Sequence, residues 1–164
     1  MQRFLYQIQD ETKLRAEKIM AERGDWPCRQ GCSDCCRRIA SEPRVSEEEW
    51  RQIAEAIQQL PADVGAAARQ RIRDAKGTAW PVTCPLLDSA SGSCLVYEAR
   101  PLACRAYGFY AERHQVLGCR QIESISLEEA EIVWGNHAAL GSKLKQLGPA
   151  KEFSVWLQAQ EGEA

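Results

Sequence analysis

Apolar residues recur at helical spacing in five segments of the chain. The first covers residues 1–23, where charged positions separate the apolar ones until Gly24 ends the pattern. Residues 46–60 and 63–76, on either side of Pro61, also have apolar residues at helical spacing. Ser46 and Glu49 have the spacing of a capping box, and Asp63 is expected to cap the second helix. The short join between the two segments predicts a helical hairpin.

Another long apolar pattern covers residues 127–147, after a second capping-box sequence from Ser126 to Glu129. Gly148 and Pro149 end it. A final short helix is expected around 152–160, with Phe153, Trp156 and Leu157 as its large apolar residues. An exposed apolar face there would suit a protein partner, but we favour the alternative in which this helix packs on the same domain.

The intervening residues predict less regular structure. We expect residues 28–36 to form a loop that runs into a short helical turn, in which Gly31 allows an unusual backbone angle. Residues 78–97 have two short apolar pieces around a turn-rich centre, which predicts a hairpin. Residues 98–106 are helical in character, with Pro101 in a first turn, and 109–117 suits a second ribbon. These patterns predict a mainly α fold: a single compact helical domain, residues 1–164, with irregular cysteine-bearing loops and one or two short β-ribbons.

Composition narrows the class of protein. The chain has 164 residues, of which 45% are hydrophobic, and a formal net charge of −2. This length suits one domain with a real core. The charge does not favour nucleic acid or an anionic membrane as a partner. The sequence has no apolar run of about 18 residues and no recognisable signal peptide, so we expect a cytoplasmic protein whose thiols are kept reduced.

Eight cysteines are the main chemical feature. Four of them lie within nine residues and the other four lie singly; they are Cys28, Cys32, Cys35, Cys36, Cys84, Cys94, Cys104 and Cys119. Disulfide frameworks belong to small secreted chains, which makes metal ligation the favoured interpretation. We expect all eight to be metal ligands. Catalytic and cofactor-binding residues are not indicated.

The cysteine spacing favours an iron–sulfur centre over zinc. Structural zinc sites usually combine two paired knuckles, whereas here a tight run is joined by solitary distal cysteines. Cys28-x3-Cys32-x2-Cys35 is also the spacing of radical S-adenosylmethionine enzymes, but it follows a helix here, and their barrels are longer. Eight thiolates could make two four-ligand sites, or one site with a remainder. Cys35 and Cys36 would diverge on an extended backbone, and so could serve different sites or bridge them.

Cationic side chains could offset thiolate charge. The candidates, of which Arg105 is favoured because it follows Cys104, are Arg29, Arg37, Arg38, Arg100 and Arg105. The two histidines, His114 and His137, are expected to be surface or packing residues. Tyr97 and Tyr107 are expected to pack near the site.

Together these cysteines resemble the YkgJ-type, or CxxCxxCC, family of zinc- or iron-chelating cysteine-cluster proteins. The resemblance spans about residues 28–119, and its first gap is one residue longer than the family label. The matching pieces are Cys28-x3-Cys32-x2-Cys35-Cys36, Cys84-Pro85-x-Leu87, Cys94-x-x-Tyr97-x-x-Arg100-Pro101-x-x-Cys104-Arg105-x-Tyr107, and Cys119. Helices at 1–23 and 127–160 flank this module. The resemblance implies a bacterial cytoplasmic protein with eight metal-linked cysteines and an iron–sulfur cluster or zinc.

These observations predict a cysteine-ligated metal-binding protein. The preferred form is an iron–sulfur protein with a structural or electron-transfer centre that acts with a protein partner. One alternative is a zinc-binding structural or interaction module. Another is a small cluster-dependent enzyme, such as a methyltransferase that uses S-adenosylmethionine. Some larger relatives are flagellin lysine methylases, but this chain shows only the cysteine module, so that activity is not carried over.

Overall fold

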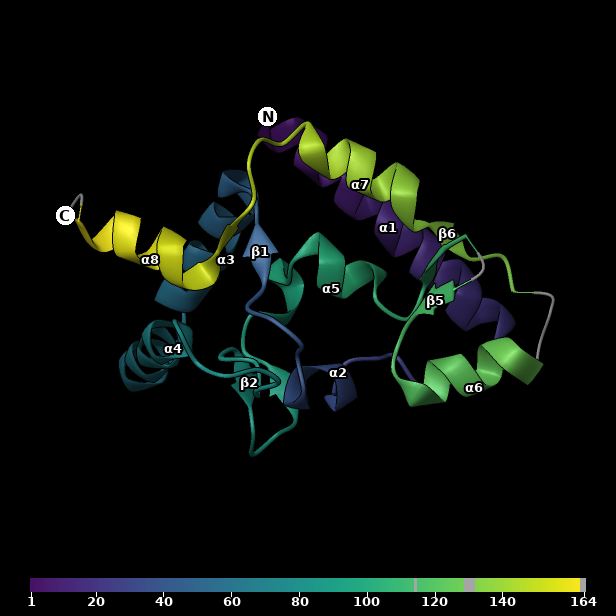
Figure 1. Cartoon of the computed structure of the whole chain (residues 1–164), viewed down its shortest axis with the longest axis horizontal. Helices are drawn as coiled ribbons and strands as arrows, with labels where there is room; N and C mark the ends of the chain where they lie inside the picture. Colours follow the sequence, from purple (N-terminus) through teal and green to yellow (C-terminus); the bar gives the residue numbers. More distant parts are fainter. Residues whose placement is uncertain (114, 129–131, 163–164) are drawn as a thin grey trace. The chain divides into compact units, whose positions relative to one another are not determined.

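The structure, a computed structural model, describes residues 1–113, 115–128 and 132–162. The chain divides into two compact units, each built from two separate stretches of sequence. Unit 1 comprises Met1–Arg29 and Pro101–Leu147, and unit 2 comprises Gln30–Arg100 and Gly148–Ala164. Helices predominate in both units, and each unit also contains short paired strands (Figure 1). The predicted mainly α fold is confirmed, and its organisation as one domain stays a prediction.

Unit 1 is built on the long N-terminal helix. Its elements are α1 (Gln2–Glu22), α5 (Leu102–Ala106), β4 (Tyr110–Glu112), β5 (Gln115–Leu117), α6 (Arg120–Glu128), β6 (Gly135–Asn136) and α7 (His137–Lys145). Strand β4 is central in a three-stranded sheet, antiparallel to β5 and parallel to β6. The ribbon expected over 109–117 is confirmed by the pairing of β4 with β5.

The core of unit 1 forms on the apolar face of α1. Leu5, Ile8 and Ile19 are buried there, separated by about one and about three helical turns. Helix α7 lies against the same helix, where Lys143 forms an ion pair with Glu11. The predicted N-terminal helix is therefore confirmed, and the largest part of its stability comes from burying this face.

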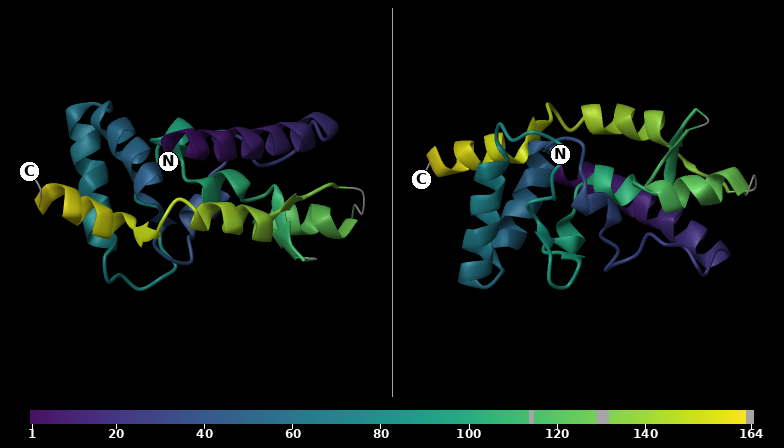
Figure 2. Two further views of the ribbon diagram at one scale, coloured as in Figure 1. Left: turned by 90° about the horizontal axis from the view of Figure 1, so that it is seen from above. Right: turned by 60° about the horizontal axis from the view of Figure 1, so that its bottom comes forward.

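Unit 2 combines a helical hairpin with the C-terminal helix. Its elements are α2 (Asp34–Arg37), β1 (Arg44–Val45), α3 (Glu47–Gln58), α4 (Ala62–Ala75), β2 (Leu87–Asp88), β3 (Ser93–Cys94), η1 (Tyr97–Ala99), β7 (Lys151–Glu152) and α8 (Phe153–Gly162). Strand β1 pairs antiparallel with β7, and β2 with β3. Helices α3, α4 and α8 pack on one another (Figure 2).

The hairpin of unit 2 follows the sequence signals closely. Ser46 accepts from the Glu49 backbone N–H, and the Glu49 carboxylate accepts from the Ser46 backbone N–H in return. The predicted capping box at the start of α3 is confirmed. Gly77, with φ of 74°, follows the end of α4 as expected. The prediction that Asp63 caps α4 is wrong, because the helix begins at Ala62 and Pro61 holds the cap position.

The prediction of one helix over 127–147 is wrong. Helix α6 ends at Glu128, and Gly135–Asn136 is an extended strand that pairs with Tyr110–Ala111 before α7 begins. Gly135 allows this pairing, because a Cβ atom there would lie only 2.6 Å from ring atoms of Tyr110. Asn136 then caps α7 by accepting from the Ala139 N–H. Ser126 lies within α6 instead of ahead of a helix, and Glu129 lies outside the described residues.

The C-terminal helix α8 packs on its own unit. Phe153 and Leu157 are buried in a core that also contains Trp50 and Ile53 of α3. The half-buried Trp156 donates from its indole Nε1 to the Val45 carbonyl oxygen over 2.9 Å. The preferred prediction, that this helix packs on its own domain, agrees with the burial of Phe153 and Leu157, and the alternative of an exposed apolar face is not seen. Within the described residues, no helix combines the length and apolar character needed to cross a bilayer.

Candidate metal centre

The eight cysteines are divided between the two units, and none of the eight, all of which the structure describes, forms a disulfide. The division falls between Arg29 and Gln30, inside the dense cysteine run. Unit 1 contains Cys28, Cys104 and Cys119; unit 2 contains Cys32, Cys35, Cys36, Cys84 and Cys94. The five thiols of unit 2 therefore form the larger group.

Cys35 and Cys36 lie together on the short helix α2. Their sulfur atoms are 3.9 Å apart. The helical backbone is held where Arg37 N–H donates to the Ser33 carbonyl, and Arg37 Nε donates to Ser33 Oγ. The expectation that the two side chains diverge assumed an extended backbone, which the structure replaces with a helical turn. The adjacent thiols can therefore bind at the same centre.

Cys84 is brought beside this turn by backbone pairing. Its N–H donates to the Cys36 carbonyl over 2.7 Å, and an antiparallel bridge joins Ile39 to Val82. Cys94 lies on β3, whose partner strand β2 begins at Leu87, three residues after Cys84. The predicted hairpin over 78–97 is confirmed and brings Cys94 to the same region.

The titration behaviour of these thiols reflects their proximity. The pKa of Cys35 is raised above its ordinary value, first by its hydrogen bond with Cys36 and then by burial. Burial raises the pKa of Cys84 to about 11, and the negative charges of Cys94 and Cys35 add to the shift. Burial also raises the pKa of Cys94. The sulfur contact, the backbone pairing and these electrostatic effects relate four thiols, which we call the four-thiol cluster: Cys35, Cys36, Cys84 and Cys94.

One arginine of unit 2 acts on this cluster. The positive charge of Arg100 favours the Cys94 thiolate and opposes the effect of burial on its pKa. The Arg100 guanidinium lies 3.8 Å from the centroid of the Tyr97 ring and donates from Nη1 to the Tyr97 carbonyl. Arg100, one of the arginines predicted to offset thiolate charge, therefore does so at Cys94, whereas the role predicted for Arg105 beside Cys104 stays a prediction. Tyr97 holds Arg100 in place.

The chemistry of the four-thiol cluster fits a thiophilic metal. Zn–S bonds of about 2.3 Å place two tetrahedral thiolate ligands about 3.8 Å apart, close to the separation of Cys35 and Cys36. Within the described residues, no three Cys, His, Asp or Glu side chains are already close enough to hold an ion. Such sites commonly close only when the metal binds and displaces the thiol protons. The residues present therefore fit a metal that completes their assembly.

The thiols of unit 1 have different surroundings. Cys28 and Cys119 are half-buried against the unit 1 core, whereas Cys104 is exposed on α5. Gly108, with φ of 86°, makes room for Cys28, because a Cβ atom at this position would overlap the Cys28 sulfur. That these three thiols and Cys32 are also ligands stays a prediction.

Of the two histidines, the structure describes only His137, which lies at the surface, one of the two roles expected for it. His137 Nδ1 lies 3.2 Å from Glu112 Oε2, and both side chains are substantially exposed. His114 lies outside the described residues. Tyr107 donates its hydroxyl to the Gly118 carbonyl over 2.8 Å, which ties α5 to the turn before Cys119.

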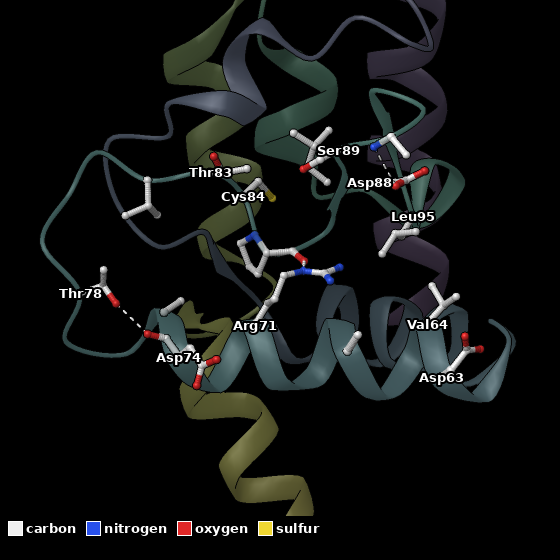
Figure 3. Close-up of a pocket in the computed structure, with 16 residues that line it drawn as sticks. Asp63, Val64, Arg71, Asp74, Thr78, Thr83, Cys84, Asp88, Ser89 and Leu95 are labelled. Carbon is white, nitrogen blue, oxygen red and sulfur yellow. Dashed lines mark hydrogen bonds between the residues drawn. The ribbon is translucent and has the colours of Figure 1, made fainter.

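A pocket of 810 Å³ opens beside Cys84 in unit 2. Its floor is one face of α4, and the segment around Thr83 and Asp88 faces it (Figure 3). Arg71 lies in this space and donates from Nε to the carbonyl of Pro85, the residue after Cys84. Arg71 was not predicted from the sequence as a site residue. The available signal was its place four residues after Ala67 and eight after Asp63, on one helix face.

These features define a class: mainly helical proteins whose irregular segments present cysteine thiols to a metal. Residues 27–135 match the model of the CxxCxxCC family, described as a "putative zinc- or iron-chelating domain". The match covers well over half of the chain, and the protein belongs to this family. The comparisons found no matching curated protein and no matching solved structure. The resemblance seen in the cysteine spacing is thus confirmed, at the level of zinc or iron chelation by cysteines.

Proposed function

We propose that this protein is an iron–sulfur protein whose centre is held by the four-thiol cluster of unit 2. The centre serves a structural or electron-transfer role with a protein partner in the cytoplasm. The observation that carries the proposal is the convergence of Cys35, Cys36, Cys84 and Cys94 from three segments of unit 2. Soft thiolate ligands select zinc, copper(I) or iron–sulfur clusters.

The sulfur separation favours one cluster type. Cys35 and Cys36 have the spacing of two ligands on one metal atom. Each iron of a [2Fe–2S] cluster takes two protein ligands, whereas four cysteines around a [4Fe–4S] cluster are spread over four irons. The adjacent pair therefore supports a [2Fe–2S] cluster. Zinc, the alternative, would satisfy the same geometry but has no redox chemistry.

The surroundings of the cluster suit electron transfer. Cys35 is exposed, whereas Cys36, Cys84 and Cys94 are half-buried. A centre that they hold would lie close to the surface of unit 2, where a partner could exchange electrons with it. Solvent exposure and nearby charge, here that of Arg100, are among the factors that set cluster potentials.

Metal and sulfide analysis of anaerobically purified protein tests the proposal. We expect iron and acid-labile sulfide in equal amounts, a visible absorption spectrum that bleaches on reduction, and little zinc. Cys94→Ser should lower the iron content by at least about half, because one of four ligands is lost. Ser93→Ala, the neighbouring substitution, should leave it unchanged. Stoichiometric zinc without sulfide would establish the zinc alternative, and folded protein without any metal would refute both.

One observation favours a second candidate, a small cluster-dependent enzyme. Such an enzyme needs a substrate pocket beside its centre, and Cys84 lines the 810 Å³ pocket. Titration calorimetry with S-adenosylmethionine tests the methyltransferase form of this candidate. Heat of binding that is lost when the pocket is filled, as in Ala67→Phe, would support it. Absence of binding to metal-loaded protein would remove it.

A further inference from the structure

The pocket beside Cys84 contains a guanidinium with unused hydrogen-bonding capacity. Arg71 Nε donates to the Pro85 carbonyl over 2.8 Å, which orients the planar group. Among the described residues, none accepts a hydrogen bond from Arg71 Nη1 or Nη2. These two terminal nitrogens form the end of a fork that matches the two oxygens of a carboxylate.

Two of the three acidic residues around the pocket, Asp74 and Asp88, have hydrogen-bond partners of their own, and the pKa of Asp88 is lowered first by its Ser91 bond and also by the positive charge of Arg71. Asp88 accepts from Ser91 Oγ and from the backbone N–H groups of Ala90 and Ser91. Asp74 accepts from the side-chain amide of Gln70, and Asp63 lies in the first turn of α4, where the helix dipole favours a negative charge. Arg71 is therefore the charged group of the pocket that has the most hydrogen-bonding groups available to a ligand.

Aliphatic side chains line two sides of the pocket, alongside the polar Thr78, Thr83 and Ser89. Val64 and Ala67 line the α4 side of the pocket, and Val82, Leu87 and Leu95 line the facing side. The volume of 810 Å³ lies within the range of small-molecule pockets, about 300–1,000 Å³. A ligand would thus find one cationic group and an apolar surface on two sides.

We propose that this pocket binds a small aliphatic monocarboxylate, with its carboxylate on the terminal nitrogens of Arg71 and its hydrocarbon body between α4 and Leu95. The three aspartates at the edge of the pocket limit the charge of the ligand. A second negative charge would be repelled by Asp63, Asp74 and Asp88, and the pocket thereby selects against dianions such as phosphonates. The proposal does not depend on which metal the four-thiol cluster holds.

Three ligands of equal chain length test the proposal on the full chain as purified, with its metal retained. Hexanoate, hexanamide and pentylphosphonate share a five-carbon alkyl chain and differ only in the head group. In titration calorimetry near pH 8, we expect hexanoate to bind roughly tenfold more tightly than hexanamide, because its hydrogen bonds with Arg71 are charge-assisted. Pentylphosphonate should bind more weakly than hexanoate. Equal binding of hexanoate and hexanamide would overturn the proposal.

Two variants locate the interaction. Arg71→Gln should bring the hexanoate and hexanamide affinities to the same value, whereas Arg73→Gln, which removes a cation from the same helix outside the pocket, should preserve their ratio. Ala67→Phe changes an exposed helical position that lines the pocket and should weaken binding of both ligands. A ratio that survives Arg71→Gln in folded protein, or binding of both ligands that is unaffected by Ala67→Phe, would refute the assignment.

Discussion

Gly108 is the residue whose missing side chain most directly accommodates a cysteine. It has a φ of 86°, and a Cβ atom on it would overlap the sulfur of Cys28. Both constraints act on the same atom, because an L side chain is strained at this φ and has no space to occupy. The position of Cys28 against the unit 1 core therefore depends on a glycine eighty residues later in the chain.

Substitution of Gly108 should destabilise the protein. We expect Gly108→Ala to lower the free energy of unfolding by about 2 kcal/mol or more, from backbone strain and the overlap with Cys28. Urea unfolding monitored by circular dichroism measures this. Gly141→Ala is the matched control: Gly141 lies within α7 and has open space around its Cα, so the change should be neutral or stabilising. Equal stability of the two variants would contradict the packing described for Cys28.

At the scale of elements, helix α3 depends on its capping box. Ser46 is buried, and its side chain and backbone both interact with Glu49. Ser46→Ala should lower the free energy of unfolding by about 1 kcal/mol, the usual effect of removing a helix cap. Ser41→Ala, at an exposed position ahead of β1, should have no measurable effect in the same urea titration. Similar losses in both variants would show that the cap does not stabilise α3.

Helix α8 is anchored by a carboxylate from a distant part of the chain. The buried Glu42 accepts from the Ser154 backbone N–H over 2.6 Å and from Ser154 Oγ over 3.0 Å. These bonds satisfy donors in the first turn of the helix and benefit from its dipole.

Removal of this carboxylate should loosen α8. We expect Glu42→Ala to lower the free energy of unfolding by about 2 kcal/mol, because charge-assisted bonds are lost and a buried N–H is left without a partner. The control Glu55→Ala removes an exposed carboxylate from α3. Amide hydrogen exchange of residues 153–162 should accelerate in the first variant only. Unchanged exchange there would rule out the anchoring role.

At the scale of the whole molecule, the two units should respond differently to metal removal. The four-thiol cluster joins α2, the Cys84 segment and β3 within unit 2, where the helical hairpin and α8 supply a separate apolar core. A metal that links these irregular segments contributes directly to their stability.

Chelation should therefore unfold unit 2 locally before it affects α1. We expect amide exchange in residues 34–39 and 82–96 to rise by at least roughly tenfold after anaerobic removal of the metal. Residues 5–19 of α1, whose apolar face is fully buried, should serve as an internal reference. Exchange that is unchanged in 34–39 and 82–96 would show that these segments hold their structure without the metal.

Prediction from sequence succeeded where local signals decide structure. The Ser46–Glu49 capping box, Pro61 and Gly77 delimit the hairpin of α3 and α4, because each acts through its own backbone or near neighbours. It failed over 127–147, where the apolar spacing suits a helix but Gly135 pairs with Tyr110 in a strand. A contact between positions so far apart in the chain overrides local helical preference.

By itself, the sequence determined the mainly helical fold, the eight thiols and membership of a zinc- or iron-chelating family, since these follow from spacing and residue type. Only the tertiary structure decided which thiols meet. The helical turn of α2 brings Cys35 and Cys36 to 3.9 Å, and the bond from Cys84 N–H to the Cys36 carbonyl adds the third thiol. The placement of Arg71 beside Cys84 is likewise tertiary. Ligand geometry depends on distances between remote segments, and these arise only when the chain packs its apolar faces.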